Sequence, residues 1–250
     1  MTLRFLDANV AVGLPRTQAL FTPLATPAEL RAYLGSAGLA GALVWHWAQA
    51  DGHPEAGNPL VEPFRQDAAD VWVCWSVLPP LTGEQEHLVE RLRAARVAAV
   101  RLFPQQHRYL MNRVVWGDLL ETLSAARLPV LLSLEQGCSY DQVYSLLADY
   151  PRLTCVLCDI GTWSMDRYTY PLLERYPNVH LETGMLSITD GGVEAAVARF
   201  GARRLVFGTG FPTRYAEAAM LQLTHAAISA ADREAIAAGN LARLLQETSL

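Results

Sequence analysis

The sequence predicts one (β/α)8 TIM barrel, an α/β fold of eight parallel strands alternating with helices, as a single domain over residues 1–250. Short apolar runs alternate eight times with longer amphipathic segments, and the chain has the length of one such barrel. In addition, 51% of the residues are hydrophobic and only 18% are charged, which supplies a large core. An open doubly wound sheet is the alternative, but no G-x-G-x-x-G motif follows the first apolar run.

The predicted strands are short apolar runs rich in valine and leucine. Near-continuous apolar runs are typical of parallel strands that are buried on both faces. Glycine and proline separate the runs from the helices between them, as at Pro79, Pro80 and Pro129. In chain order the runs are residues 3–6, 42–45, 71–77, 98–103, 130–134, 154–158, 179–181 and 205–207.

Several of the segments between these runs carry helix start signals. Thr26 precedes a proline and then an acid, which is the order of a capping residue, the first helical position and a first-turn carboxylate. Ser139, with Gln142 three residues later, forms a capping-box pattern. Residues 83–96 carry apolar positions at three- and four-residue spacing, and Ser229 precedes the last helical pattern. Helices are therefore expected after the first, third, fifth and eighth strands.

Composition argues against several classes of function. Twenty basic and 25 acidic residues give a net charge of −5, and a solvated helix face explains the one locally basic segment, residues 91–96, so no nucleic-acid partner is expected. No apolar stretch approaches the ~20 residues of a membrane helix, and the N-terminus lacks a secretory pattern. The four cysteines lie in apolar runs, which favours a reduced, cytoplasmic protein. Cys155 and Cys158 would point to opposite faces of one strand.

Four segments together resemble the amidohydrolase superfamily, of the amidohydrolase-2 type. Residues 5–11 read Phe-Leu-Asp-Ala-Asn-Val-Ala, where that family carries a hydrophobic pair, Asp, a small residue and His-x-His. Residues 100–104 and 204–212 resemble its fourth- and eighth-strand segments, and residues 232–245 resemble its closing helix. The resemblance runs from end to end and implies metal-dependent hydrolase chemistry at the carboxyl ends of the strands.

The resemblance also implies a position for each metal ligand of the family, and here the sequence departs from the pattern. The family's ligands are His-x-His on the first strand, histidines on the fifth and sixth strands, and an aspartate on the eighth. The equivalent positions hold Asn9, Ala11, Ser133, Asp159 and Gly210. Alanine and glycine offer no side-chain donor, and a neutral amide is a poor ligand for a transition metal. No metal cofactor of the family's kind is therefore expected.

Polar and aromatic residues near the predicted carboxyl ends of the strands are the candidate site residues. The catalytic candidates are His46, Arg101, His107, Glu135 and Asp159. The substrate-binding candidates are Trp75, Tyr109, Trp163, Glu182, Thr209 and Arg214. Each set also has a structural interpretation: histidines bonded to the backbone, tryptophans that pack, and a buried ion pair of Arg101 with Glu135 or Asp159.

Three functions remain open from the sequence. The first is a hydrolase or lyase that acts on a small polar or anionic molecule without the family's metal. The second is a non-catalytic barrel that binds a small ligand or a partner; a homo-oligomer is compatible with either. The third is a metal enzyme in which a divalent metal is held by replacement ligands from four strands, namely His46, Glu135, Asp159 and Glu182.

Overall fold

Eight parallel strands form one sheet whose order follows the sequence from β1 to β8. The computed structural model describes residues 3–16, 20, 22–65, 70–81, 84–160, 166–188 and 191–250. The strands are β1 (Leu6–Val12), β2 (Gly41–His46), β3 (Val71–Ser76), β4 (Ala99–Leu102), β5 (Val130–Ser133), β6 (Cys155–Cys158), β7 (Val179–Glu182) and β8 (Leu205–Val206).

The sheet closes into a barrel where the chain after β8 returns to β1. The backbone N–H of Ala8 donates to the carbonyl of Phe207 at 2.9 Å, and that of Ala11 donates to the carbonyl of Phe211 at 2.8 Å. Val10 also pairs in parallel with Phe211. Because the last strand thus joins the first, the predicted (β/α)8 barrel is confirmed.

The first strand lies further along the chain than predicted. The apolar run predicted a strand over residues 3–6, but β1 begins at residue 6 and pairs with β2 as far as Val12. Its register shifts between Asp7 and Val10, and the polar side chains of Asp7 and Asn9 are both buried. They are tolerated in a buried strand because each has hydrogen-bond partners inside the barrel mouth.

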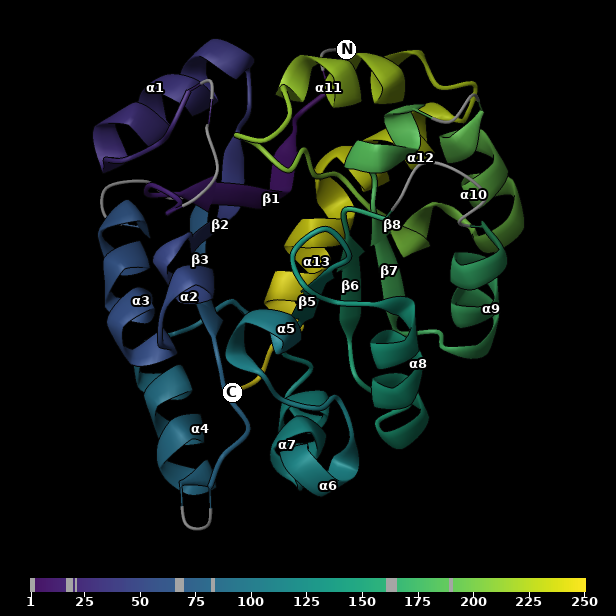
Figure 1. Ribbon diagram of the computed structural model, residues 1–250. Coiled ribbons are helices and arrows are strands. Elements are labelled where there is room, and N and C mark those ends of the chain that lie inside the picture. The colour runs from purple at the N-terminus through teal and green to yellow at the C-terminus, as the bar shows by residue number, and fades with distance from the viewer. Residues whose placement is uncertain are drawn as a thin grey trace.

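Helices surround the strands (Figure 1). The capping boxes predicted at Thr26 and Ser139 are both present, and each opens a helix at the next residue. The helices are α1 (Pro27–Ala37), α2 (Ala48–Asp51), α3 (Pro54–Val61), α4 (Gln85–Ala94), α5 (Pro104–His107), α6 (Arg113–Trp116), α7 (Leu119–Ala125), α8 (Tyr140–Asp149), α9 (Asp166–Arg175), α10 (Gly192–Phe200), α11 (Ala216–His225), α12 (Ala230–Glu234) and α13 (Asn240–Gln246). Short 3-10 turns lie at η1 (Glu62–Arg65), η2 (Gly184–Ile188) and η3 (Ala202–Arg204), and a π turn, η4 (Ala235–Gly239), precedes α13.

The core has two apolar layers, one between strands and helices and one inside the barrel. Cys155 belongs to the outer layer and Cys158 to the inner layer, as expected for strand residues three apart. Leu241 and Leu244 of α13 join the inner layer. The last helix therefore packs against the interior of the barrel. Within the described part of the chain, no helix has the length and apolar character needed to cross a bilayer.

Candidate functional site

Asp159, which directly follows β6, is the centre of a polar network at the carboxyl ends of the strands. Its carboxylate accepts hydrogen bonds from Asn9 Nδ2 at 3.1 Å, from Ser133 Oγ at 2.5 Å and from Arg214 Nη2. Arg101 Nη2 lies 3.7 Å from the same carboxylate, whose side chain is 2% exposed. Both carboxylate oxygens are therefore occupied, by side chains that arrive from different parts of the barrel.

Arg101 brings a fully buried positive charge to this network from β4. Its Nη1 donates to Asn9 Oδ1 and its Nη2 to Gln136 Oε1, both at 3.1 Å. The guanidinium carbon lies 4.5 Å from the centre of the Trp45 ring. A buried charge needs a partner of opposite sign, and the predicted ion pair with Asp159 supplies it. Nothing in the sequence pattern pointed to Gln136.

Arg214 is the second cation, and it enters the network from the segment after β8. Its Nη1 donates to Glu135 Oε2 at 2.7 Å, and its Nε donates to the carbonyl of Thr209 at 3.2 Å. A Cβ on Gly210 would lie 2.2 Å from Arg214 Nη2, so the guanidinium occupies the space that a side chain at position 210 would need. Gly210 also has a φ of +69°, which favours glycine.

Two buried carboxyl groups beside the network have raised pKa values. Burial, followed by the nearby charge of Asp159, raises the pKa of Glu182 to about 7, although the backbone N–H of Asp159 donates to it at 3.2 Å. Burial likewise raises the pKa of Asp7 to about 6. Thr209 donates to Asp7 through its hydroxyl at 2.6 Å and its N–H at 3.1 Å. The structure thus places Thr209 against Asp7, which was not among the predicted site residues.

The two candidate histidines, His46 at the end of β2 and His107 at the end of α5, are both bonded to the backbone. His46 Nδ1 accepts from the N–H of Ala48 at 3.0 Å, and a Cβ on Gly13 would lie 2.2 Å from its Nε2. His107 Nε2 lies 3.0 Å from the carbonyl oxygen of Gly52. Burial lowers the pKa of both imidazoles, so both are neutral at pH 7. The local bonds match the structural interpretation of these residues.

His107 and two further candidates, Trp75 and Tyr109, line a separate cavity of about 650 Å³ beside β3 and α4. The indole N–H of Trp75 donates to Glu62 at 2.6 Å, and the hydroxyl of Tyr109 accepts from the N–H of Phe103 at 2.9 Å. Neither Arg101 nor Asp159 lines this cavity. The predicted set is therefore divided between two places, and Trp163 lies outside the described residues.

The residues at the positions that the resemblance assigns to a metal do not fit a divalent cation. Asp159 alone offers a carboxylate, its oxygens are occupied, and the positive guanidinium of Arg214 is in contact with it. Among the residues that the structure describes, no group of three or more His, Cys, Asp or Glu side chains could hold a metal ion. The four predicted replacement ligands therefore do not form such a group in the described part of the chain. They are His46, Glu135, Asp159 and Glu182.

Solved structures with the same barrel cover nearly the whole chain. An uncharacterized TIM-barrel protein from Bordetella bronchiseptica has a TM-score of 0.76 and 16% identity, over 98% of this chain and 99% of that chain. A dihydroxybenzoic acid decarboxylase from Polaromonas with bound manganese and 2-nitroresorcinol has a TM-score of 0.75 and 15% identity, over 98% and 97%. A probable 2-pyrone-4,6-dicarboxylic acid hydrolase from Acinetobacter baumannii with citric acid bound has a TM-score of 0.73 and 13% identity, over 98% and 100%.

These likenesses show the shared fold. No curated protein matches the chain. The family model described as amidohydrolase matches residues 21–246, which is most of the barrel. This match agrees with the strand-end segments and with the closed eight-stranded sheet. The chain therefore belongs to the amidohydrolase family, of the amidohydrolase-2 type.

Proposed function

We propose that this chain is a hydrolase or lyase that binds a small carboxylate at the barrel mouth, with the cation of Arg214 in place of the family's metal. The family supports hydrolase or lyase chemistry, and its structural neighbours include a decarboxylase and a probable hydrolase. Both of these neighbours are named for a carboxylic acid, 2-pyrone-4,6-dicarboxylic acid in one case and dihydroxybenzoic acid in the other. A carboxylate is also the group that a guanidinium binds with two parallel hydrogen bonds.

The observation that carries the proposal is the position and accessibility of Arg214. Its guanidinium fills the space beside Gly210 and contacts Asp159, yet its side chain is still 22% exposed. Its other partner, Glu135, is 48% exposed and comes from the loop after β5. An incoming carboxylate can exchange with Glu135 on the guanidinium at little electrostatic cost, because one negative charge replaces another.

The remaining residues of the network then divide into contact and positioning roles. Arg101 is fully buried, and it positions Asp159 rather than touching the substrate. Glu182 is also fully buried and positions the backbone of residue 159. Glu135 is the exposed carboxylate next to the bound anion, and we assign it the proton transfer.

The test compares wild type with Arg214→Gln on a panel of aromatic and aliphatic carboxylates, lactones and amides in the presence of EDTA. We expect turnover that survives the chelator and a loss of about 10- to 100-fold in kcat/KM for Arg214→Gln, because a charged hydrogen bond to the substrate is lost. Arg31→Gln, on the exposed face of α1, is the matched control and keeps full activity.

Elemental analysis of protein purified without added metal tests the second half of the proposal. We expect well under one divalent ion per chain. One bound zinc, manganese or iron per barrel, removed by chelation together with the activity, would show that Arg214 does not replace the metal. Turnover that is unchanged in Arg214→Gln would show that the carboxylate binds elsewhere.

A non-catalytic binding barrel is the second candidate, and one observation favours it. The carboxylate of Asp159 has all its hydrogen-bond partners within the protein, and both candidate histidines are bonded to the backbone. The same carboxylate panel separates the two functions. A ligand that raises the melting temperature through Arg214 without being converted supports the binding barrel.

A further inference from the structure

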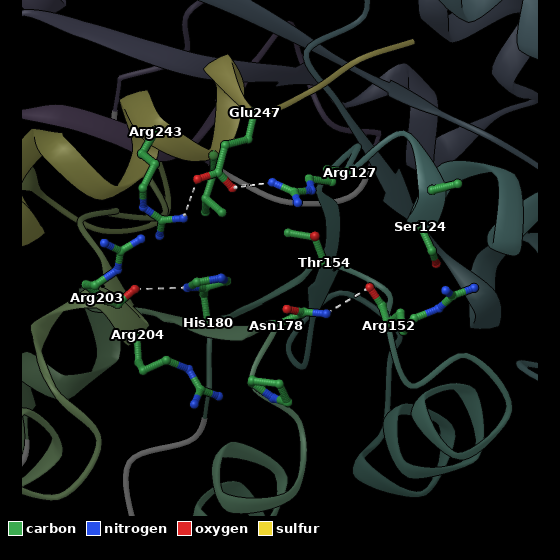
Figure 2. Close-up of a pocket in the computed structure, with 13 residues that line it drawn as sticks. Ser124, Arg127, Arg152, Thr154, Asn178, His180, Arg203, Arg204, Arg243 and Glu247 are labelled. Carbon is green, nitrogen blue, oxygen red and sulfur yellow. Dashed lines mark hydrogen bonds and ion pairs between the residues drawn. The ribbon is translucent and has the colours of Figure 1, made fainter.

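A pocket of about 540 Å³ opens at the end of the barrel opposite the mouth (Figure 2). Thr154, Asn178 and Arg204 line it, and each of them lies directly before a strand, β6, β7 or β8. Because parallel strands all begin at one end of a barrel, these residues mark its amino-terminal end. The pocket is therefore separate from the network around Asp159.

The lining of this pocket is strongly cationic in a chain whose net charge is −5. Glu247 is the one carboxylate in the lining, and it lies 3.3 Å from Arg243 and 3.9 Å from Arg127. The chain has no lysine, so its twenty basic residues are all arginines, and five of them are here. They are Arg127, Arg152, Arg203, Arg204 and Arg243.

One of these five arginines is fully engaged in holding the fold. Arg204 donates to the carbonyls of Val179 at 2.7 Å, Leu173 at 3.0 Å and Tyr176 at 2.7 Å. These bonds tie the end of α9 to the start of β7, and burial lowers the pKa of the guanidinium. Arg204 therefore stabilises the fold, and it contributes to the pocket mainly through its positive charge.

The other four arginines lie on two sides of the pocket, and Arg152 also pairs with Glu121, outside the lining, at 3.3 Å. Arg203 is exposed, and within the described chain its guanidinium has no hydrogen-bond or ion-pair partner. Arg243 has a buried Nε without a partner. Figure 2 shows these two on one side of the pocket, Arg127 and Arg152 on the other, and Thr154 between them.

The pKa of the buried His180 of β7 is lowered by its burial and by the arginines of this pocket. Its Nδ1 lies 3.2 Å from the carbonyl oxygen of Arg203, and its side chain is 5% exposed. Burial, followed by the charges of Arg204, Arg243 and Arg203, lowers the pKa of His180 to about 4. The imidazole is therefore neutral at pH 7, and the arginines carry the charge of the pocket.

We propose that this pocket binds a phosphorylated small molecule between Arg203 and Arg243 on one side and Arg127 and Arg152 on the other. A phosphate group presents three oxygens in different directions, which suits guanidinium groups that arrive from separate elements. The volume is that of a small-molecule site, and it exceeds the volume of a single phosphate. The acidic remainder of the chain disfavours a nucleic-acid polymer, which needs an extended basic surface.

The experiment is a calorimetric titration of pyrophosphate into the full chain at about 150 mM salt, where nonspecific attraction is screened. We expect saturable binding of one pyrophosphate per chain and a loss of at least about tenfold in affinity for Arg203→Gln, from one charged hydrogen-bonding group. Because Arg203 is exposed and its side chain has no partner among the described residues, this variant is expected to fold normally. Arg31→Gln is the control and binds within about twofold of wild type.

A second variant and two other ligands make the result decisive. Arg243→Gln, checked for folding by its melting curve, weakens pyrophosphate binding as Arg203→Gln does. The proposal is overturned if pyrophosphate does not saturate the protein or if Arg203→Gln binds it as wild type does. Citrate that binds equally well at matched ionic strength would overturn the assignment to phosphate, and a short oligonucleotide that binds more tightly would assign the pocket to a polymer.

Discussion

The two ends of this barrel both gather arginines, but they balance the charge differently. At the mouth, Arg101 and Arg214 share the carboxylate of Asp159, and Glu135 adds a second negative charge. At the opposite end, five arginines line a pocket that contains one carboxylate, Glu247. Balanced charge inside a protein holds the fold together, whereas unbalanced charge in a pocket invites a ligand of opposite sign.

β7 shows the same contrast within one strand. His180 near its start and Glu182 at its end are two residues apart, so both side chains face the barrel interior. Burial favours the neutral form of each group, lowering the pKa of His180 to about 4 and raising that of Glu182 to about 7. The two ends of the barrel should therefore respond to pH in opposite directions.

The largest expected effect is at the centre of the mouth network. Asp159→Asn removes the counter-charge of the fully buried Arg101, so we expect a loss of about 3–5 kcal/mol in the free energy of unfolding, measured by urea denaturation. Glu174→Gln breaks an ion pair that is half exposed on both sides and should cost less than about 1 kcal/mol. Equal losses in the two variants would mean that the mouth network contributes no more than a surface pair.

The carboxyl group of Glu182 should make the mouth less stable as pH rises. Its folded pKa of about 7 lies above the usual 4.5, so the folded state binds more protons between these values. The stabilisation is present below about pH 4.5 and is lost as pH rises through 7, by about 3 kcal/mol at most. Glu182→Gln does not titrate, so denaturation at pH 5, 6.5 and 8 should show wild type losing stability relative to it. A constant difference would contradict the raised pKa.

The imidazole of His180 should produce the opposite trend at the other end. Its folded pKa of about 4 lies below the usual 6.5, so the unfolded state binds more protons between these values. The stabilisation is present above about pH 6.5 and is lost as pH falls towards 4, again by about 3 kcal/mol at most. His180→Asn keeps a donor for the carbonyl of Arg203 without titrating, and wild type should lose stability relative to it between pH 7.5 and 4.5. If wild type instead gained stability on acidification, the sign of the shift would be wrong.

The smallest effects separate two adjacent arginines of the pocket. Arg204→Ala removes three hydrogen bonds to backbone carbonyls and should cost about 2 kcal/mol in a urea titration. Arg203→Ala removes an exposed side chain that has no partner in the part of the chain that the structure describes, and it should stay within about 0.5 kcal/mol of wild type. Loss of stability in Arg203→Ala would show that this residue serves the fold and is not free for a ligand.

Much of the fold could be predicted from the sequence because it depends on local patterns. Apolar runs predict buried parallel strands, and the capping boxes at Thr26 and Ser139 predict helix starts to the residue. The start of β1 could not be predicted in this way. The side chains of its polar residues Asp7 and Asn9 bond to Arg101, Asp159 and Thr209, which lie 92 to 202 positions away, and no local pattern contains those partners.

The candidate site was predicted only in part, for a related reason. Strand-end position placed Arg101, Glu135, Asp159 and Arg214 at one end of the barrel, and ion pairs join them there, because the ends of parallel strands meet. A sequence does not show which hydrogen bonds a side chain makes. The sequence therefore allowed both a catalytic and a structural interpretation of His46, and the structure shows its bond to the backbone. The arginine pocket was not predicted because its residues lie before strands or in the last helix, where the sequence contains no catalytic motif.

The junction between β1 and the end of β8 affects how the chain folds during synthesis. Asp7 receives the hydroxyl and the N–H of Thr209, which lies 202 positions later, and β8 itself has only two residues. During synthesis Asp7 emerges early, but Thr209 becomes available only when almost the whole barrel has left the ribosome, so ring closure is a late and slow contact to form. The same junction, with so short a strand on one side, is where we expect amide hydrogens to exchange first when the finished ring opens.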